Sequence, residues 1–216
     1  MPRLNAAVAG SALELGGIAR LSSCDWPGEL VATLFTQGCP WACRYCHNAG
    51  LIPRGPGRLD WPEVLAFLSG RRGLLDGVVI SGGEPTLQKA LPEALQAIRA
   101  MGFRTGLHTA GPYPGRLARV LPLLDWVGFD VKGPWEAYAR ITGVPGGGRA
   151  ARESLLRLRD SGVAYDLRTT VHPALLCPDD LEAMDAGLAA DGLPPARRQP
   201  FRSEGCSDPD LRAPAL

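Results

Sequence analysis

The chain is 216 residues long, carries a formal net charge of +1 and has a mixed composition. This length can bury one substantial core, and the near-neutral charge argues against a surface that binds nucleic acid by neutralising many phosphates. No apolar run approaches the roughly 20 residues that cross a bilayer, so we expect neither a nucleic-acid partner nor a membrane span.

Residues 1–29 show no regular pattern. Asn5, Ser11 and Glu14 interrupt the apolar residues near the start, so a secretory signal is not expected. The cysteines do not form a disulfide framework, and a reducing, cytoplasmic location is therefore expected. The Pro- and Gly-rich end, residues 192–216, is interpreted as either partly disordered or a docking segment for a partner. The expected division is an N-terminal lead at 1–29, one domain at 30–201 and a C-terminal tail at 202–216.

Strand and helix patterns alternate from residue 30 onward. Asp60 and Pro62 indicate the start of a helix, and Gly102 and Gly162 follow the ends of two others. Apolar residues at 91, 94, 95 and 98 have helical spacing. The predicted strands are 30–37, 76–81, 103–109, 126–132, 163–171 and 197–201, and the predicted helices are 60–71, 88–101, 115–124, 149–161 and 178–190.

Alternating strands and helices predict a parallel sheet joined by right-handed crossovers. Six strands are too few for a closed barrel of eight units. We therefore predict an α/β fold, a partial (β/α)6 TIM-like barrel with an open lateral mouth. Functional residues are expected at the C-terminal ends of its strands, where polar residues do follow: the cysteine-rich run after the first strand, Ser81 to Pro85, His108 and Thr109, Asp130 and Lys132, and Arg168 to His172.

Cys39, Cys43 and Cys46 have CxxxCxxC spacing in the run GCPWACRYCHN. Three thiolates on a cubane iron-sulfur cluster leave one iron open to another ligand, which makes the cluster a reaction site. The alternative is a structural zinc ion held by these cysteines and His47. The other three cysteines, Cys24, Cys177 and Cys206, are scattered and are interpreted as loop or buried thiols.

This spacing resembles the signature of the radical S-adenosylmethionine (SAM) superfamily. The motifs S..DWPG and F.QGCP..C.YCHN resemble those of one branch of this superfamily, the glycyl-radical-enzyme activating enzymes, and especially the class for anaerobic ribonucleoside-triphosphate reductase. The resemblance spans roughly residues 15–206. Matching residues include Asp25, Trp26, Pro27, Gly28, Phe35, Gln37, Gly38, Cys39, Pro40, Tyr45, His47, Asn48 and Leu51.

The resemblance implies a 4Fe-4S cluster on the three cysteines, with SAM chelating the open iron. By the same resemblance, Tyr45 contacts the adenine through its backbone, and the GGE motif of Gly82, Gly83 and Glu84 holds the methionine amino group. Lys132 would contact the polar end of SAM, with Asp130 orienting it. Three residues on one face of the fifth strand are candidates for a ribose or carboxylate contact, with a core or cap role equally open for the last of them: Arg168, Thr170 and His172.

The resemblance further implies cleavage of SAM to a 5'-deoxyadenosyl radical, which abstracts a hydrogen atom from a glycine Cα of a partner enzyme. The implied partners are a glycyl-radical enzyme, most similar to anaerobic ribonucleotide reductase, and a flavodoxin or ferredoxin as electron donor. No residue is assigned as a catalytic acid or base. Two alternatives stay open: a radical SAM enzyme acting on a metabolite, like 7-carboxy-7-deazaguanine synthase, and a non-catalytic zinc-stabilised binding module.

The third strand end departs from the pattern of the activating enzymes. Many of them carry Asp-Thr-Asn-Gly there, whereas this chain has His108, Thr109, Ala110 and Gly111. The role of that aspartate cannot be carried over to this chain. The chain also lacks a cysteine-rich insertion for further clusters, so a single cluster is expected.

Overall fold

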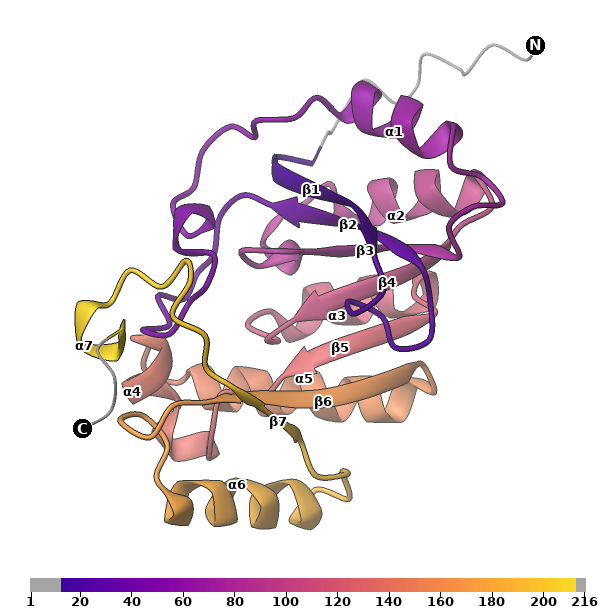
Figure 1. Cartoon of the computed structure of the whole chain (residues 1–216). Coiled ribbons are helices and arrows are strands. Elements are labelled where there is room, and N and C mark those ends of the chain that lie inside the picture. Colours follow the sequence, from indigo (N-terminus) through magenta and orange to yellow (C-terminus); the bar gives the residue numbers. More distant parts are fainter. Residues whose placement is uncertain (1–12, 213–216) are drawn as a thin grey trace.

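The computed structural model describes residues 13–212, and a curved seven-stranded sheet forms its centre (Figure 1). The strands follow one another in space in chain order, from β1 to β7. The last six are parallel, as predicted, and within the described residues β1 does not pair with β7, so the barrel stays open. The strands are β1 Leu15–Ser22, β2 Val31–Thr36, β3 Gly77–Gly82, β4 Arg104–Thr109, β5 Trp126–Asp130, β6 Ala164–Val171 and β7 Arg197–Pro200.

Strand β1 was not predicted, because its sequence LGGIARLS combines two glycines with irregular polarity. It lies inside the segment interpreted as a lead and pairs antiparallel with β2, with Ile18 opposite Leu34. The pairing contains two register shifts. An antiparallel edge strand depends on its neighbour more than on its own residues, which explains why the local pattern is weak.

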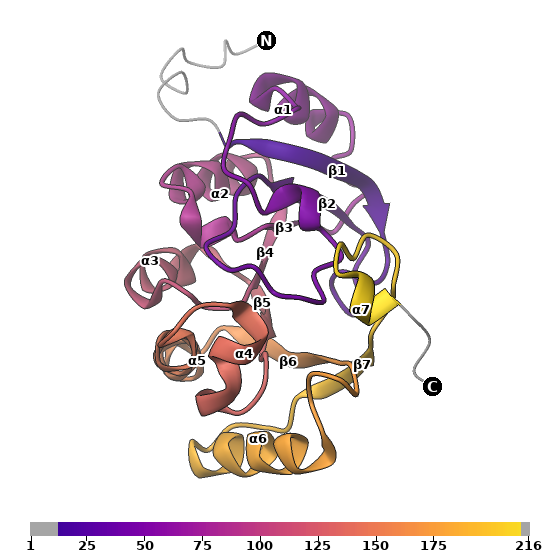
Figure 2. The same ribbon diagram turned by 90° about the vertical axis from the view of Figure 1, so that its left-hand side faces the viewer.

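Helices cover the outer, convex face of the sheet (Figures 1 and 2). The five predicted helices are present, each within about four residues of its expected ends, because the capping signals are local. Gly162, for example, adopts the left-handed conformation with φ 75° and ends the helix predicted at 149–161. Two short helices, α4 and α7, were not predicted. The helices are α1 Trp61–Ser69, α2 Leu91–Ala100, α3 Pro114–Val120, α4 Tyr138–Thr142, α5 Gly147–Ser161, α6 Pro178–Ala190 and α7 Pro209–Arg212.

Alternate residues of each strand face opposite sides of the sheet. On the convex side they form the main core with the helices; Leu34, Ile80, Leu107 and Phe129 are fully buried there. In the part of the chain that the structure describes, no helix is both long and apolar enough to cross a membrane.

The concave side is filled in its lower half by Trp26, which the β1–β2 loop inserts into the barrel. Its ring stacks on Trp126 with centroids 5.4 Å apart. Glycines on the facing strands make room for it: a Cβ at Gly77 or Gly106 would lie 3.2 or 2.9 Å from the Trp26 ring. We call Trp26 and Trp126, with Val31 and Val79, the aromatic floor.

Candidate functional site

Above the aromatic floor, the concave face opens into a cavity of about 1030 Å³ at the C-terminal ends of the strands. It lies between the two unjoined edges of the sheet, since Cys24 and Asp25 line it on the β1 side and Gln199 and Pro200 on the β7 side. Every predicted site residue except His172 lines this cavity. These residues are Cys39, Cys43, Tyr45, Cys46, Gly82, Gly83, Glu84, Asp130, Lys132, Arg168 and Thr170.

The cysteine loop follows β2, and backbone hydrogen bonds hold it against two other segments of the chain. The amide of Cys39 donates to the carbonyl of Ile52 (3.0 Å), and the amide of Ala42 donates to Thr142 at the end of α4 (3.0 Å). All three thiols are free. Burial raises the pKa of Cys39 to about 12 and also raises the pKa of Cys43 and Cys46, so the thiolates require positive charge nearby.

The donor set fits a cubane cluster. A structural zinc ion needs four protein ligands, whereas a cubane that binds a further ligand at one iron needs only the three thiols present here. His47, the fourth ligand of the zinc alternative, is engaged elsewhere: its Nδ1 lies 3.2 Å from the Glu204 carbonyl and its ring stacks on Phe201.

The glycines of the GGE turn bring β3 against the cysteine loop. Gly82 has φ 120°, and a Cβ there would lie 2.2 Å from the amide nitrogen of Thr36. A Cβ at Gly83 would lie 2.3 Å from the carbonyl oxygen of Gly38. The two turns are therefore packed backbone to backbone, and the amide of Glu84 donates to Gly38 (2.9 Å).

Glu84 is buried, with 2% of its surface exposed, and links β3 to the end of β4. Its Oε1 accepts from the Thr86 amide (3.0 Å), the Thr86 hydroxyl (2.6 Å) and the Thr109 hydroxyl (2.8 Å). Its Oε2 accepts from the Ala110 amide (3.1 Å) and from no other group among residues 13–212. Burial raises the pKa of this carboxyl, and Oε2 retains capacity to accept from a ligand ammonium.

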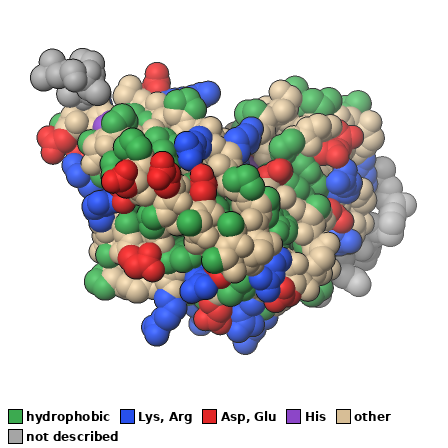
Figure 3. Space-filling model, turned by 90° about the horizontal axis from the view of Figure 1, so that it is seen from below, with side chains coloured by type: hydrophobic (Ala, Val, Ile, Leu, Met, Phe, Trp, Pro, Cys, Tyr) green, Lys and Arg blue, Asp and Glu red, His purple; other side chains and the backbone are tan. Residues whose placement is uncertain are grey.

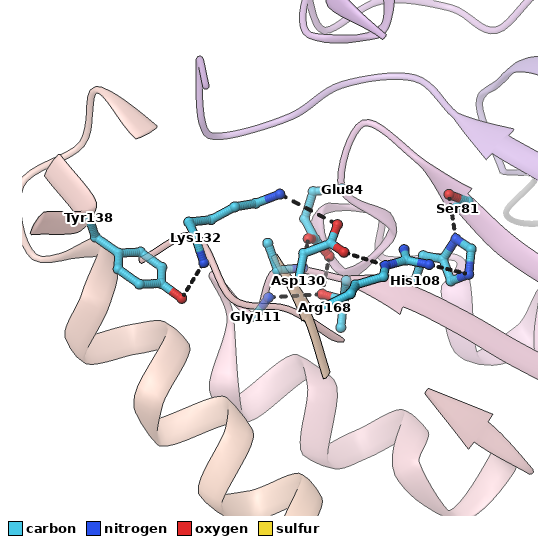
Figure 4. A network of polar contacts seen from close by, with 10 residues as sticks. Ser81, Glu84, His108, Gly111, Asp130, Lys132, Tyr138 and Arg168 are labelled. Carbon is cyan, nitrogen blue, oxygen red and sulfur yellow. Dashed lines mark hydrogen bonds and ion pairs between the residues drawn. The ribbon is translucent and has the colours of Figure 1, made fainter. Parts of the chain in front are cut away.

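A chain of ionisable groups crosses the cavity wall from Lys132 to His108 (Figure 4). Asp130 accepts from Lys132 Nζ (3.4 Å) and from Arg168 Nε (2.5 Å). Burial alone would raise the pKa of Asp130, but Arg168 and then Lys132 outweigh it and hold that pKa well below its usual value. In turn, burial would lower the pKa of Lys132, but Asp130 keeps it well above its ordinary value. The expected Lys132–Asp130 pairing is thus present, with Arg168 as a third member.

His108 terminates this chain as a neutral imidazole. Burial, followed by the neighbouring Arg168, lowers its pKa to about 4. Its Nε2–H donates to the Asp25 carbonyl (2.7 Å), and its Nδ1 accepts from the Ser81 hydroxyl (3.2 Å). His108 therefore connects the β1–β2 loop to Lys132, Asp130 and Arg168, which we call the charged wall; Arg168 Nη1 lies 3.2 Å from its Nε2.

Tyr45 lies beneath Lys132, whose Nζ is 5.5 Å from the centre of the tyrosine ring. The Tyr45 hydroxyl is buried and has no hydrogen-bond partner within the described residues. Lys132 is further fixed by its backbone amide, which donates to the Tyr138 hydroxyl (3.0 Å). The ammonium is thus held over an aromatic face at the cavity wall.

His172 does not line the cavity, so the candidate role as a cofactor contact does not fit its position. Its Nδ1 accepts from the Ala174 amide (3.1 Å), and its Nε2 lies 3.3 Å from the Leu211 carbonyl. Both ring nitrogens serve the backbone, which is the cap role left open by the sequence. The strand alternation that placed it with Arg168 and Thr170 fails because β6 ends at Val171.

The cavity also contains residues that sequence reasoning missed. Asp25 is part of the DWPG motif but is not among the predicted site residues. Gln199, Arg202 and Glu204 come from the C-terminal segment, which folds back over the cysteine loop. No local signal marks them, because their position depends on contacts with residues far away in the chain.

The sequence profile of the Radical SAM superfamily matches residues 33–184. The chain belongs to the radical SAM superfamily. This superfamily uses a 4Fe-4S cluster and SAM, and the matched region contains the cysteine loop, the GGE turn and the Lys132–Asp130–Arg168 network.

A protein of Methanocaldococcus jannaschii, named as a proposed glycyl-radical enzyme activating enzyme, is 30% identical over 78% of this radical SAM chain and 72% of its own. The pyruvate formate-lyase-activating enzyme of Clostridium pasteurianum is 32% identical over 70% of this chain and 65% of its own. A PqqA peptide cyclase of Rhodopseudomonas palustris is also 32% identical, but this chain spans only 45% of its length.

Among solved structures, the enzyme anSMEcpe with bound AdoMet superposes with a TM-score of 0.60 at 15% identity, over 77% of this chain and 49% of the other. Streptococcus suis SuiB bound to its precursor peptide gives a TM-score of 0.64 at 12% identity, over 80% and 39%. At these identities the likeness concerns the fold, a partial TIM barrel.

Proposed function

We propose that the chain is a glycyl-radical enzyme activating enzyme. The proposal rests on one observation above all: the three-cysteine loop, the Glu84 turn and the Lys132–Asp130–Arg168 network face a single cavity on the open side of the barrel. The two relatives that carry an activating-enzyme name support the same reading.

In this proposal Cys39, Cys43 and Cys46 bind three irons of the cluster, and the fourth iron binds SAM. When bound and reduced by an external donor, the cluster would supply one electron to SAM, and cleavage of SAM to methionine would provide a 5'-deoxyadenosyl radical that can take a hydrogen atom from a glycine Cα. The proposed SAM contacts are Tyr45, Gly82, Gly83, Glu84, Asp130, Lys132, Arg168 and Thr170.

The residues fit the charges of the methionine part of SAM. Glu84 Oε2 can accept from its ammonium, whereas Lys132 and Arg168 offer cationic groups to its carboxylate. Asp130 keeps both cations aligned rather than free to move. The orphan hydroxyl of Tyr45 is a further buried donor at the edge of the cysteine loop.

The opening of the cavity, rather than its volume, supports a macromolecular substrate. Its volume of about 1030 Å³ lies at the upper end of the range of small-molecule and cofactor sites, about 300–1000 Å³, and the cluster and SAM would share it. Because the cavity opens between the two sheet edges, a loop of a partner protein that presents a glycine has a route to it.

Within this class we propose anaerobic ribonucleoside-triphosphate reductase as the partner, because the chain contains the motifs DWPG and QGCPWACRYCHN. A flavodoxin or ferredoxin is proposed as the source of the single electron, because the cluster requires a low-potential donor. An oxygen-sensitive cluster fits a reducing cytoplasm, which is the location proposed.

The test is anaerobic incubation of the reduced, reconstituted protein with SAM and candidate glycyl-radical enzymes, followed by electron paramagnetic resonance. We expect a glycyl doublet with the reductase, and its loss when the acceptor glycine is replaced by alanine. A doublet only with another glycyl-radical enzyme would reassign the partner. Release of 5'-deoxyadenosine without any protein radical would overturn the activase proposal in favour of a metabolite substrate.

A further inference from the structure

The chain after β7 turns back and crosses the cysteine loop, as both ribbon views show (Figures 1 and 2). Cys206 and Leu211 of this segment are buried against Tyr45 of the loop. The same small cluster includes Ile141 of α4 and two residues after β6, Leu175 and Leu176. An apolar contact thus joins the C-terminal segment to the residue directly before Cys46.

Arg44, which lies between two of the cysteines, is tied to the same segment. Its guanidinium is 2.6 Å from Asp208 and 3.6 Å from Asp210. Its carbonyl accepts from the Cys206 thiol (3.3 Å). Backbone and side chain of this one loop residue therefore both contact the C-terminal segment.

His47, directly after Cys46, makes the third set of contacts. Its ring stacks on Phe201, and its Nδ1 lies 3.2 Å from the Glu204 carbonyl. Gly205 has φ 77°, and a Cβ there would lie only 2.0 Å from the His47 carbonyl oxygen. Only glycine permits this close approach of the two backbones.

His172 contacts both ends of this segment. It contacts Phe201 edge to face, with ring centroids 4.9 Å apart, and Leu211 through its carbonyl. The histidine that does not reach the cavity therefore anchors the segment that covers the cysteine loop.

We propose that residues 201–211, here called the clasp, position the cysteine loop for its cluster, and that retention of the cluster depends on them. Arg44, Tyr45 and His47 are the loop residues through which the clasp acts. Groups that orient metal ligands from outside typically change metal retention by 10- to 100-fold when removed. The clasp also contributes Arg202 and Glu204 to the cavity wall, on the side of the cysteines. This inference rests on the proposed function only in that the three cysteines hold the cluster.

The first test compares two glycines of matched conformation in the full chain. Gly205→Ala introduces a Cβ against His47, whereas Gly162→Ala imposes the same left-handed strain (φ 75°) with no atom within 4 Å of the new Cβ. After anaerobic reconstitution, we expect iron release to a chelator to be about tenfold faster in Gly205→Ala than in the unchanged protein. Gly162→Ala should release iron at the unchanged rate.

The second test uses exposed ion pairs, so that folding is preserved. Arg44→Ala removes the pair with Asp208, and Arg99→Ala removes a comparably exposed pair with Asp125 on the far side of the sheet. Hydrogen exchange of residues 42–48 in the metal-free protein supplies a reading independent of iron. We expect faster exchange there in Arg44→Ala only.

The outcomes separate the clasp from the proposed function. If the unchanged protein retains iron and sulfide, and Gly205→Ala and Arg44→Ala retain them equally well, the clasp is overturned while the activase proposal stands. If the two clasp variants lose iron but their controls do not, the clasp is supported whether or not a glycyl radical is ever detected. A chain that binds no iron at all would overturn both.

Discussion

Two halves of the same concave face differ in character. In the lower half, the strands present small residues such as Gly106 and Gly128; Trp26 from the β1–β2 loop packs over the first, and Trp126 packs over the second. Two residues further along the same strands, His108 and Asp130 face the cavity. Residues two apart in a strand share one face of the sheet. The same face of each strand therefore carries the aromatic floor in its lower half and the charged wall in its upper half.

The lower half stabilises the barrel, whereas the upper half carries the groups that can bind a ligand. The floor is closed by aromatic stacking and needs no ligand. The wall keeps an aspartate, a lysine and an arginine partly out of water, which costs free energy unless they pair or meet a ligand. Changes in the floor should therefore affect folding, and changes in the wall and the cysteine loop should affect binding.

The face that carries α6 lacks this organisation. Seen from below, side chains of both charges and hydrophobic side chains are interspersed over it (Figure 3). That face therefore shows no single strongly basic area, in keeping with the net charge of +1.

The largest effect is expected on the cysteine loop. Cys43→Ser should abolish cluster retention, because a hydroxyl is a poor replacement for a thiolate ligand of iron. Cys177→Ser, at an exposed cysteine capping α6, is the matched control and should retain iron and sulfide in full. Equal iron content in both variants would show that Cys43 is not a ligand.

The floor should respond with a loss of folding free energy. Trp26→Ala removes a stacked ring that is 3% exposed and leaves a cavity over the glycines, at an expected cost of about 3–5 kcal/mol in chemical denaturation. The folded fraction should still take up iron, since Trp26 does not touch the cysteines. A cost below about 1 kcal/mol would contradict the role given to the floor.

The wall should respond in both folding and binding. Asp130→Asn removes the counter-charge of Lys132 and Arg168, at an expected cost of about 2–3 kcal/mol, less than for a fully buried pair because the carboxylate is 31% exposed. SAM affinity, measured by calorimetry, should fall. Asp125→Asn, at the opposite end of β5 and 30% exposed, is the control and should leave SAM affinity unchanged. Equal SAM affinity in the two variants would remove Asp130 from the binding site.

A pH dependence of stability is expected from His108. Its folded pKa of about 4 lies below its ordinary value of 6.5, so the unfolded chain binds more protons between these values. Stability should therefore fall as the pH is lowered from 6.5 to about 4, by on the order of 1–3 kcal/mol. His108→Gln should flatten this part of the denaturation profile, and an unchanged profile would assign the effect to another group.

The smallest effect is expected where floor and wall meet. The buried Thr33 hydroxyl donates to Asp25 Oδ2 (2.7 Å) and so fixes the loop that carries Trp26. Thr33→Val should cost about 1 kcal/mol in denaturation experiments without a change in SAM affinity. A large loss of SAM affinity would mean that the β1–β2 loop belongs to the wall and not to the floor.

Much of the sheet could be predicted because its signals are local. Buried runs followed by Gly, Ser or a charged residue identify the parallel strands. The rule that strand ends carry function selects Glu84, Asp130, Lys132 and Arg168, and all four line the cavity. The chemistry of these residues follows from their type. Their gathering in one place follows from parallel topology.

The rest depends on contacts between distant residues. β1 is a strand because β2 lies beside it, and the clasp is ordered because Tyr45 and Arg44 lie beneath it. His172 follows a strand end, where a cofactor contact is expected, yet its Nε2 lies 3.3 Å from the carbonyl of Leu211, which is distant in the chain. No spacing rule within the sequence reports such a partner.

The central assignment is a cluster held by three cysteines with one iron left for SAM. Electron-nuclear double resonance of the reduced, reconstituted protein tests it directly, using SAM isotopically labelled in its amino and carboxylate groups. Coupling of both labels to the cluster is predicted. A cluster spectrum that SAM does not alter, or a tightly bound zinc ion in place of iron, would contradict the assignment.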